Sequence, residues 1–185
     1  MSRTEGSVLI TVTGKKVDDK IYLLNHVQPL FQSVFGLQLT TRYRRGENTM
    51  DLYRHCKKVA LTMHSWGMPI GLKKLQILKP KLPVSASAFI RGLFDTDGSV
   101  YRKYGPYAQV QFKTVSVELM SLVRDELITL GFHPTRLRPD ETKHRFLLCW
   151  QNEVEKFFGV VNPSNPKHIE RLKWIRRSIT QDDMG

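Results

Sequence analysis

Residues 88–99, AFIRGLFDTDGS, hold the most informative pattern in this sequence. They complete an apolar segment that begins at residue 84 and predict a helix that ends in two carboxylates, Asp95 and Asp97, with Gly98 directly after them. Carboxylates at a helix C-terminus oppose the helix dipole, so this placement is unfavourable unless a cation compensates. Hard divalent cations such as Mg²⁺ bind carboxylate oxygens, but an Asp-Gly turn that merely ends the helix is an equally good interpretation.

The same helix carries a row of small residues. Ala88, Gly92 and Thr96 are spaced by four, which places them on one helical face. Because a glycine inside a helix costs about 1 kcal/mol relative to alanine, we expect this face to pack closely against another helix. The alternative is an ordinary amphipathic helix with an incidental glycine.

The regions before and after this segment repeat one order of elements. Each reads as strand, helix, two hairpin strands and a short helix, over residues 7–13, 18–35, 37–45, 49–55 and up to 66, and again over 107–114, 116–130, 133–139, 144–150 and up to 158. A last helix follows from residue 165, and the second half adds the helix 84–97 and a strand 99–103 at its front. The prediction is an α+β fold of two antiparallel sheets, each covered by helices on one face.

The two predicted halves are residues 1–80 and 81–185, separated by a proline-marked boundary at 79–83. The first half is expected to be truncated: its strand 7–13 corresponds to a second strand, and a first helix and first strand are missing. Its helix 18–35 is expected to be bent by Pro29 and to present one apolar face, formed by Ile21, Leu24, Val27, Phe31 and Val34.

The net charge of +12 and the pI near 9.9 favour a polyanionic partner. Gln and Arg side chains, which hydrogen-bond adenine and guanine edges, alternate with apolar ones along the strands, on faces that look nearly free of acids. The candidate DNA contacts are Gln38, Thr40, Arg42, Arg44, Arg102, Lys103, Gln109, Gln111, Lys113, Arg136, Arg138 and Arg145. An ordinary solvated sheet face is the alternative, and the basic last helix touches phosphates or only water.

Other classes receive little support. The sequence shows no signal peptide and no apolar run of the roughly 20 residues that span a membrane, so an intracellular location is expected. Its two cysteines, Cys56 and Cys149, indicate buried thiols rather than a disulfide framework.

Residues 90–98, IRGLFDTDG, resemble the nine-residue signature of the LAGLIDADG homing endonucleases, and GKKVDDKIYLLNHVQPLFQSVFG, RRGENTMDLY and GMPIGLKKLQI extend the resemblance to archaeal and intein-type members. The resemblance implies two motif helices packed side by side and two sheets that form a saddle in the DNA major groove. It also implies an acidic residue, here Asp97 beside Gly98, that binds Mg²⁺ for two-metal phosphodiester hydrolysis. Asp95 corresponds to the less critical acidic position. A basic residue near the end of a second strand is also implied, and Lys113 is its nearest candidate.

This sequence departs from the family in having one motif where single-chain members have two. Two copies of the chain could pair through helix 84–97 as a homodimer with two Asp97 side chains; the chain could be a fragment or half of a split enzyme; or it could be a decayed member that binds DNA without cutting. The leading prediction is a site-specific, Mg²⁺-dependent double-strand DNA endonuclease that needs a second chain. The alternative is an inactive DNA-binding protein, such as a regulator or an RNA-splicing maturase.

Overall fold

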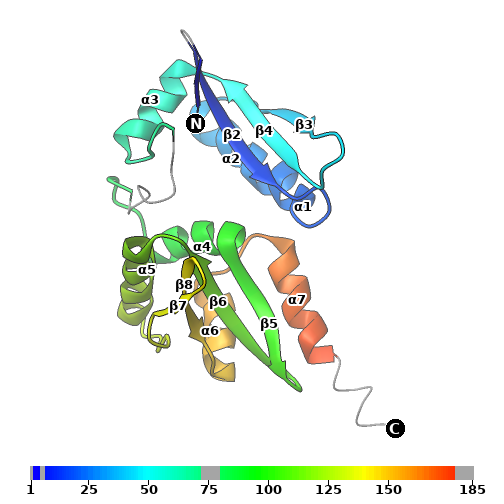
Figure 1. Cartoon of the computed structure of the whole chain (residues 1–185), viewed down its shortest axis with the longest axis vertical. Helices are drawn as coiled ribbons and strands as arrows, with labels where there is room; N and C mark the ends of the chain where they lie inside the picture. Colours follow the sequence, from blue (N-terminus) through cyan, green and yellow to red (C-terminus); the bar gives the residue numbers. More distant parts are fainter. Residues whose placement is uncertain (1, 5–6, 72–79, 178–185) are drawn as a thin grey trace. The chain divides into compact units, whose positions relative to one another are not determined.

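The computed structural model describes residues 2–4, 7–71 and 80–177, and it divides into two compact units, Met1–Leu82 and Pro83–Gly185 (Figure 1). The chain has the predicted α+β fold, with one antiparallel four-stranded sheet in each unit. Part of the predicted boundary at 79–83, and most of the segment before it, lies outside the described residues.

In the first unit the strands run in the spatial order β1-β2-β4-β3. The elements are β1 (Ser2–Thr4), β2 (Ser7–Gly14), α1 (Lys20–Tyr22), the π-helical turn η1 (Leu23–Val27), α2 (Gln28–Phe35), β3 (Thr40–Tyr43), β4 (Met50–His55) and α3 (Lys57–Ser65). The expectation that a first strand is missing is wrong, because β1 pairs with β2 in antiparallel register. Among the described residues before β2, none is helical.

The helix predicted over residues 18–35 contains an irregular turn that shifts its buried face. Gln28 donates its backbone N–H to the carbonyl of Leu23, five residues back, directly before Pro29. Proline has no N–H and its ring crowds the carbonyl four residues earlier, so a wider π-turn at this point relieves both problems. The buried side chains are consequently Tyr22, Leu23, Val27 and Phe31, whereas Ile21 and Val34 of the predicted face are exposed.

The second unit has the strand order β5-β6-β8-β7, the same as the first. Its elements are α4 (Ala86–Asp97), β5 (Gly98–Tyr104), β6 (Tyr107–Thr114), α5 (Val117–Thr129), β7 (Arg138–Asp140), β8 (Lys143–Leu148), α6 (Gln151–Val160) and α7 (Pro166–Arg177). Ser116 begins α5 as predicted, because its hydroxyl accepts the backbone N–H of Leu119 at 3.2 Å. Equivalent strand orders establish the repeat that the sequence pattern indicated.

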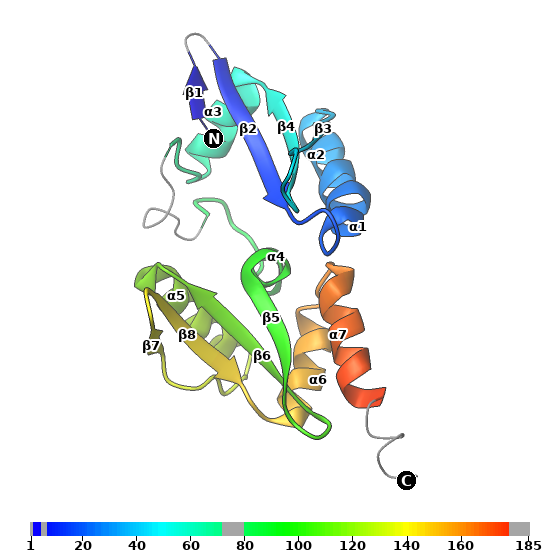
Figure 2. The same ribbon diagram turned by 45° about the vertical axis from the view of Figure 1, so that its right-hand side comes forward.

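Each sheet has a helix-covered face and an open face. In β6, Ala108, Val110 and Phe112 are fully buried, as their alternation predicts, and Phe112 packs against Phe94 of α4 with ring centroids 5.3 Å apart. Figures 1 and 2 show α5 and α6 on this side of the second sheet, with the other side uncovered. The open side is called the outer face below.

The two cysteines are half-buried free thiols, which agrees with the absence of a disulfide framework in the sequence pattern. Over the described ranges, no helix combines the length and the apolar character needed to cross a bilayer.

Candidate metal end and nucleic-acid interface

The motif helix α4 begins at a conventional cap and ends at a glycine that packing requires. Ser85 accepts the backbone N–H of Ala88 at 3.2 Å, and Gly98 donates its own N–H to the carbonyl of Phe94 at the other end. A Cβ atom at Gly98 would collide with the ring and the carbonyl of Phe94. Because Gly98 has no side chain, β5 can begin directly after the last residue of α4.

Asp95 is a structural carboxylate. It is buried, and it accepts the backbone N–H groups of Ser164 at 2.9 Å and of Asn165 at 3.0 Å, immediately before α7. The Asn165 side chain donates in return to the backbone carbonyl of Asp95 at 2.9 Å. The charge that opposes the dipole of α4 is thus stabilised by backbone donors at the start of α7. Asp95 ties α7 to the motif helix.

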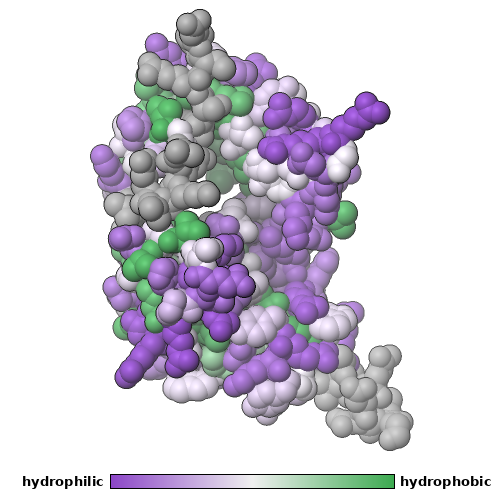
Figure 3. Space-filling model, viewed as in Figure 1, coloured by the Kyte–Doolittle hydropathy of each residue, from purple (hydrophilic) through white to green (hydrophobic). Residues whose placement is uncertain are grey.

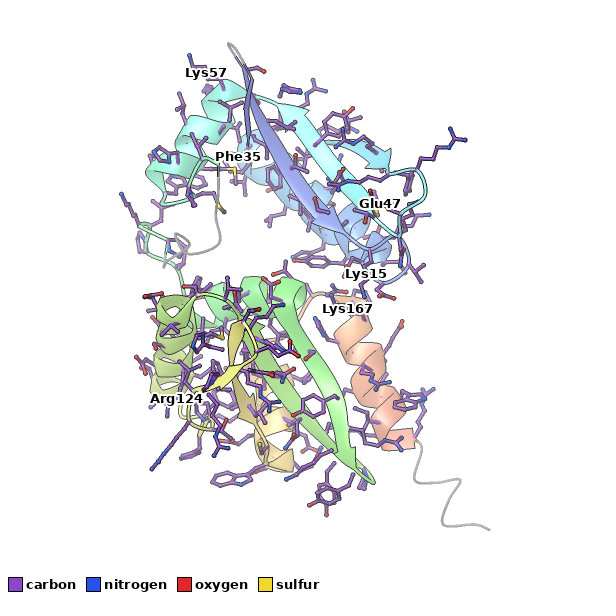
Figure 4. All side chains as sticks on the ribbon, in the orientation of Figure 1. Lys15, Phe35, Glu47, Lys57, Arg124 and Lys167 are labelled. Carbon is purple, nitrogen blue, oxygen red and sulfur yellow. The ribbon has the colours of Figure 1, made fainter. Side chains whose placement is uncertain are left out.

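Asp97 lies two residues further along and keeps access to solvent. The surrounding protein still removes enough water to raise the pKa of its carboxyl, although a hydrogen bond from Thr96 and the charges of Lys143 and Lys167 act in the opposite direction. Lys143 begins β8, and Lys167 lies at the N-terminal end of α7, where Figure 4 labels it. Asp97 is therefore an acid with cationic neighbours from two other elements.

The small-residue face of α4 is open. Ala88, Gly92 and Thr96 are all exposed, and among the described residues no atom would lie within 4 Å of a Cβ atom at Gly92. The Thr96 hydroxyl turns back onto the helix, and its one proton is shared among acceptors that include the carbonyl of Leu93 at 3.0 Å and the Asp97 carboxylate at 3.4 Å. Nothing on this face would obstruct the close approach of a second helix.

The outer face of the second sheet collects several predicted side chains. Cross-strand pairing places Lys113 opposite Arg145 and Arg138 opposite Arg145, so these cations lie on one face, together with Gln109, Gln111 and Lys103. Gln109 is buried within this face, and Gln111 accepts the hydroxyl proton of Ser99 at 3.2 Å. Hydrophilic side chains cover much of the side seen in Figure 3.

The expectation that these faces are nearly free of acids is wrong. Asp140 in β7 forms an ion pair with Lys113 at 2.9 Å, and Arg145 lies 3.4 Å from the same carboxylate. The hydrogen bond from Lys113 lowers the pKa of Asp140. The predicted catalytic residue Lys113 therefore has an acidic partner of its own within the sheet.

The first sheet holds a more enclosed acid. Asp51, fully buried on the outer face of β4, accepts hydrogen bonds from Arg42 at 2.9 Å and Arg44 at 3.0 Å, and from the Thr13 hydroxyl at 2.8 Å. Burial alone would raise the pKa of Asp51, but the bonds from Arg44, Arg42 and Thr13 prevail and lower it to about 2. Two arginines predicted as base contacts thus neutralise a buried carboxylate.

Three predicted contacts lie elsewhere. Arg102 pairs with Ala108, on the helix-covered side of the sheet, and its guanidinium stacks over Trp174 at 4.6 Å. Arg136 lines a cavity of about 310 Å³ beside α5, with Ser121, Arg124, Asp125 and Leu137; Figure 4 labels Arg124. Gln38 is exposed but precedes β3, whereas Thr40 lies within that strand. The strand predicted over 37–45 is shorter than expected.

Sequence reasoning missed the two lysines beside Asp97. Lys143 lies two residues before Arg145 in β8 and shares its face, so the alternation of the strand could have identified it. Lys167 had no comparable signal, because only the long-range tie between Asp95 and residues 164–165 brings α7 to this place.

The end of α4 provides only part of a Mg²⁺ site, because Asp97 is its one solvent-accessible acidic side chain. The Asp97 carboxylate and the backbone carbonyl of Gly98 are hard oxygen donors of the kind Mg²⁺ prefers. Over residues 2–4, 7–71 and 80–177, however, no three His, Cys, Asp or Glu side chains come together as a ready metal cage. The donor set fits a divalent cation only if a second acid joins it.

Residues 85–162 match the family model described as a LAGLIDADG-like domain, which spans α4 to α6. Residues 85–162 of the second unit are therefore similar to a LAGLIDADG-like domain, in agreement with the resemblance of residues 90–98. No protein of curated function is significantly similar to the sequence.

Solved structures share the fold over most of the chain. A complex of the homing endonuclease I-DmoI with target DNA and Mg has a TM-score of 0.59 at 17% identity, covering 88% of this chain and 86% of that one. Meganuclease I-SmaMI bound to uncleavable DNA gives 0.60 at 14% identity, covering 96% and 80%. Full-length DUF199/WhiA from Thermotoga maritima gives 0.57 at 11% identity, covering 92% and 53%.

Proposed function

We propose that this protein is a site-specific, Mg²⁺-dependent double-strand DNA endonuclease. The observation that carries the proposal is the position of Asp97, a solvent-accessible acid at the end of a motif helix, where Lys143 and Lys167 approach it. The solved relatives I-DmoI and I-SmaMI are a homing endonuclease and a meganuclease bound to DNA. Duplex DNA would lie with its major groove on the outer faces of the sheets.

Different residues of this chain would bind the cation and the DNA phosphates. Asp97 and the carbonyl of Gly98 would hold the cation, which when bound would activate water and neutralise charge on the phosphate being cleaved. Lys143 and Lys167 would attract that phosphate, since ammonium groups bind phosphate as point charges. Lys113, whose ammonium lies 2.9 Å from the Asp140 carboxylate, would contact the DNA backbone further from the cation and help to position it.

The second acid would come from another motif helix. A second copy of the chain would supply it if the exposed face of Ala88, Gly92 and Thr96 packs against its own counterpart as a symmetric homodimer. Light scattering, with the mass of any bound duplex subtracted, would then give a protein mass near 43 kDa, twice the 21.5 kDa of one chain. A mass of one chain under all conditions would contradict the homodimer.

The activity is tested with a randomised duplex library and Mg²⁺, using Asp97→Asn as the matched variant. The wild type is expected to cleave a subset of sequences, whereas Asp97→Asn should bind DNA with unchanged affinity and cut at least about a thousandfold more slowly, as expected for loss of a residue essential to metal catalysis. Cleavage by Asp97→Asn at the wild-type rate would refute the assignment.

A DNA-binding protein without nuclease activity is the second candidate. The fold is shared with DUF199/WhiA, which is not named as an endonuclease, and the described residues place only one exposed motif acid at the end of α4. Binding of duplex DNA without Mg²⁺-dependent cleavage by wild type would favour this candidate.

A further inference from the structure

The β5–β6 hairpin end carries a group of exposed aromatic rings. Tyr104 and Tyr107 flank the turn and are 59% and 45% exposed, with ring centroids 5.0 Å apart. Trp174 of α7 is 50% exposed and lies beside the same strand, since its ring contacts Arg102. Large rings with this much exposure in one place usually mark a binding surface.

Cations alternate with these rings. The Arg102 and Arg171 guanidiniums lie 4.6 Å and 4.3 Å from the centroid of Trp174, and the Lys103 ammonium lies 5.4 Å from that of Tyr104. These three cations and the three rings are named the hairpin-end cluster. Stacking against a ring fixes the plane of a guanidinium.

Two of the three cations in the cluster are available to a ligand. Among the described residues, neither Lys103 nor Arg171 forms an ion pair with a carboxylate, whereas Arg176 on the same helix lies 3.1 Å from Glu155. α7 carries five Lys and Arg residues against one Glu within Pro166–Arg177. The cluster is therefore a basic surface with interleaved aromatic rings.

We propose that the hairpin-end cluster binds unpaired nucleotides of a single-stranded nucleic acid. Bases stack on aromatic rings and on guanidinium planes, while phosphates bind the cations between them. A continuous duplex hides its base faces, so exposed rings at this spacing suit a single strand better. The site extends beyond the duplex surface proposed above: Arg102 points to the helix-covered side of the sheet, and α7 lies outside the residues that match the family model, whereas Lys103 and Tyr107 lie on the outer-face side of the hairpin.

The test measures fluorescence anisotropy of labelled oligo-dT and oligo-rU of about 12 nucleotides, within the usual length of such sites, and of a duplex of equal length. The full-length chain should bind both single strands, and a preference for one would identify DNA or RNA as the natural ligand. Trp174→Leu, and Tyr104→Leu with Tyr107→Leu, should each weaken single-strand binding about tenfold, as expected for loss of a stacked base. Duplex binding should change little.

Two controls separate stacking from general effects. Tyr43→Leu removes an equally exposed ring from the first unit and should leave single-strand affinity unchanged. Trp174→Phe keeps an aromatic ring and should retain most of the binding, and thermal unfolding of every variant checks the fold.

A charge comparison completes the test. Arg171→Gln should lower the slope of log affinity against log salt by about 0.7, the value for one lost phosphate contact on a single strand. Arg176→Gln removes the same charge from the same helix, but from an arginine paired with Glu155, and should lower it less. Failure of the wild type to bind single strands, or loss of binding in the arginine variants with none in the ring variants, would overturn the proposal. Equal losses of duplex affinity would identify the cluster as a duplex-backbone or general anion surface instead.

Discussion

The two units share one strand order but place an acidic residue on the outer face in different ways. In the first, Asp51 is fully enclosed by Arg42, Arg44 and Thr13, whereas in the second a quarter of the Asp140 side chain stays exposed beside Lys113. A buried carboxylate depends on its partners, but an exposed pair is screened by water and contributes little. The difference therefore lies in the acids, because Asp51 depends on its protein partners alone, whereas water also reaches Asp140.

The largest expected effect is the loss of both arginines around Asp51. Arg42→Met with Arg44→Met leaves the carboxylate buried without a cation, which should destabilise the first unit by about 3–5 kcal/mol. Urea unfolding followed by Trp66 fluorescence measures this unit, because Trp66 stacks on Phe35 of α2 at 5.4 Å.

The matching variant in the second unit tests whether the buried and the exposed acid differ in their dependence on a cation. Lys113→Met breaks the pair with Asp140, whose exposed carboxylate can be solvated, so stability should fall by less than about 1 kcal/mol. Equal losses of stability in the two units would contradict the distinction drawn between the two acids.

The repeat and the motif could be predicted because both are local patterns. Alternation in residues 107–114 correctly gave the buried face of β6, and the spacing of Ala88, Gly92 and Thr96 placed them on one helical face, whose packing against a second helix stays a prediction. The partners of Asp95 and Asp51 could not be predicted, since they join residues that are far apart in the sequence or lie on different strands. Charge alone also could not reveal that Arg42 and Arg44 are held by Asp51.

The second largest loss of stability is expected when the hydrogen bonds between Asp95 of α4 and the residues before α7 are removed. Asp95→Ala removes a buried acceptor of the N–H groups of Ser164 and Asn165, and a hydrogen bond to a charged group is worth about 1.5–3 kcal/mol. The second unit should lose about 3 kcal/mol, with α7 released first. Amide hydrogen exchange in α7 measures this, and unchanged protection there would contradict the role of Asp95.

Acid should weaken the first unit more than the second. The pKa of Asp51 is about 2 in the folded chain against an ordinary value of 3.8. Its stabilisation is therefore complete above about pH 5 and is lost as the pH falls through 3.8 toward 2, a change of about 2 kcal/mol. Asp51→Asn should flatten this pH dependence, and the same profile in wild type and variant would refute the linkage.

The smallest expected effect on stability belongs to Asp97→Asn. Folding raises the pKa of this carboxyl, so the anion present at neutral pH is disfavoured by the fold, and its cost appears as the pH rises through that pKa. A neutral amide should leave stability within about 0.5 kcal/mol of wild type, with any shift toward greater stability. Urea unfolding of the second unit at neutral pH measures it beside Asp95→Ala. If Asp97→Asn were as destabilising as Asp95→Ala, both acids would be structural. That result would contradict the assignment of Asp97 as a ligand of the cation. If only Asp95→Ala destabilises, the fold depends on the first aspartate and tolerates the second at a cost, which is expected of a residue retained for binding rather than for packing.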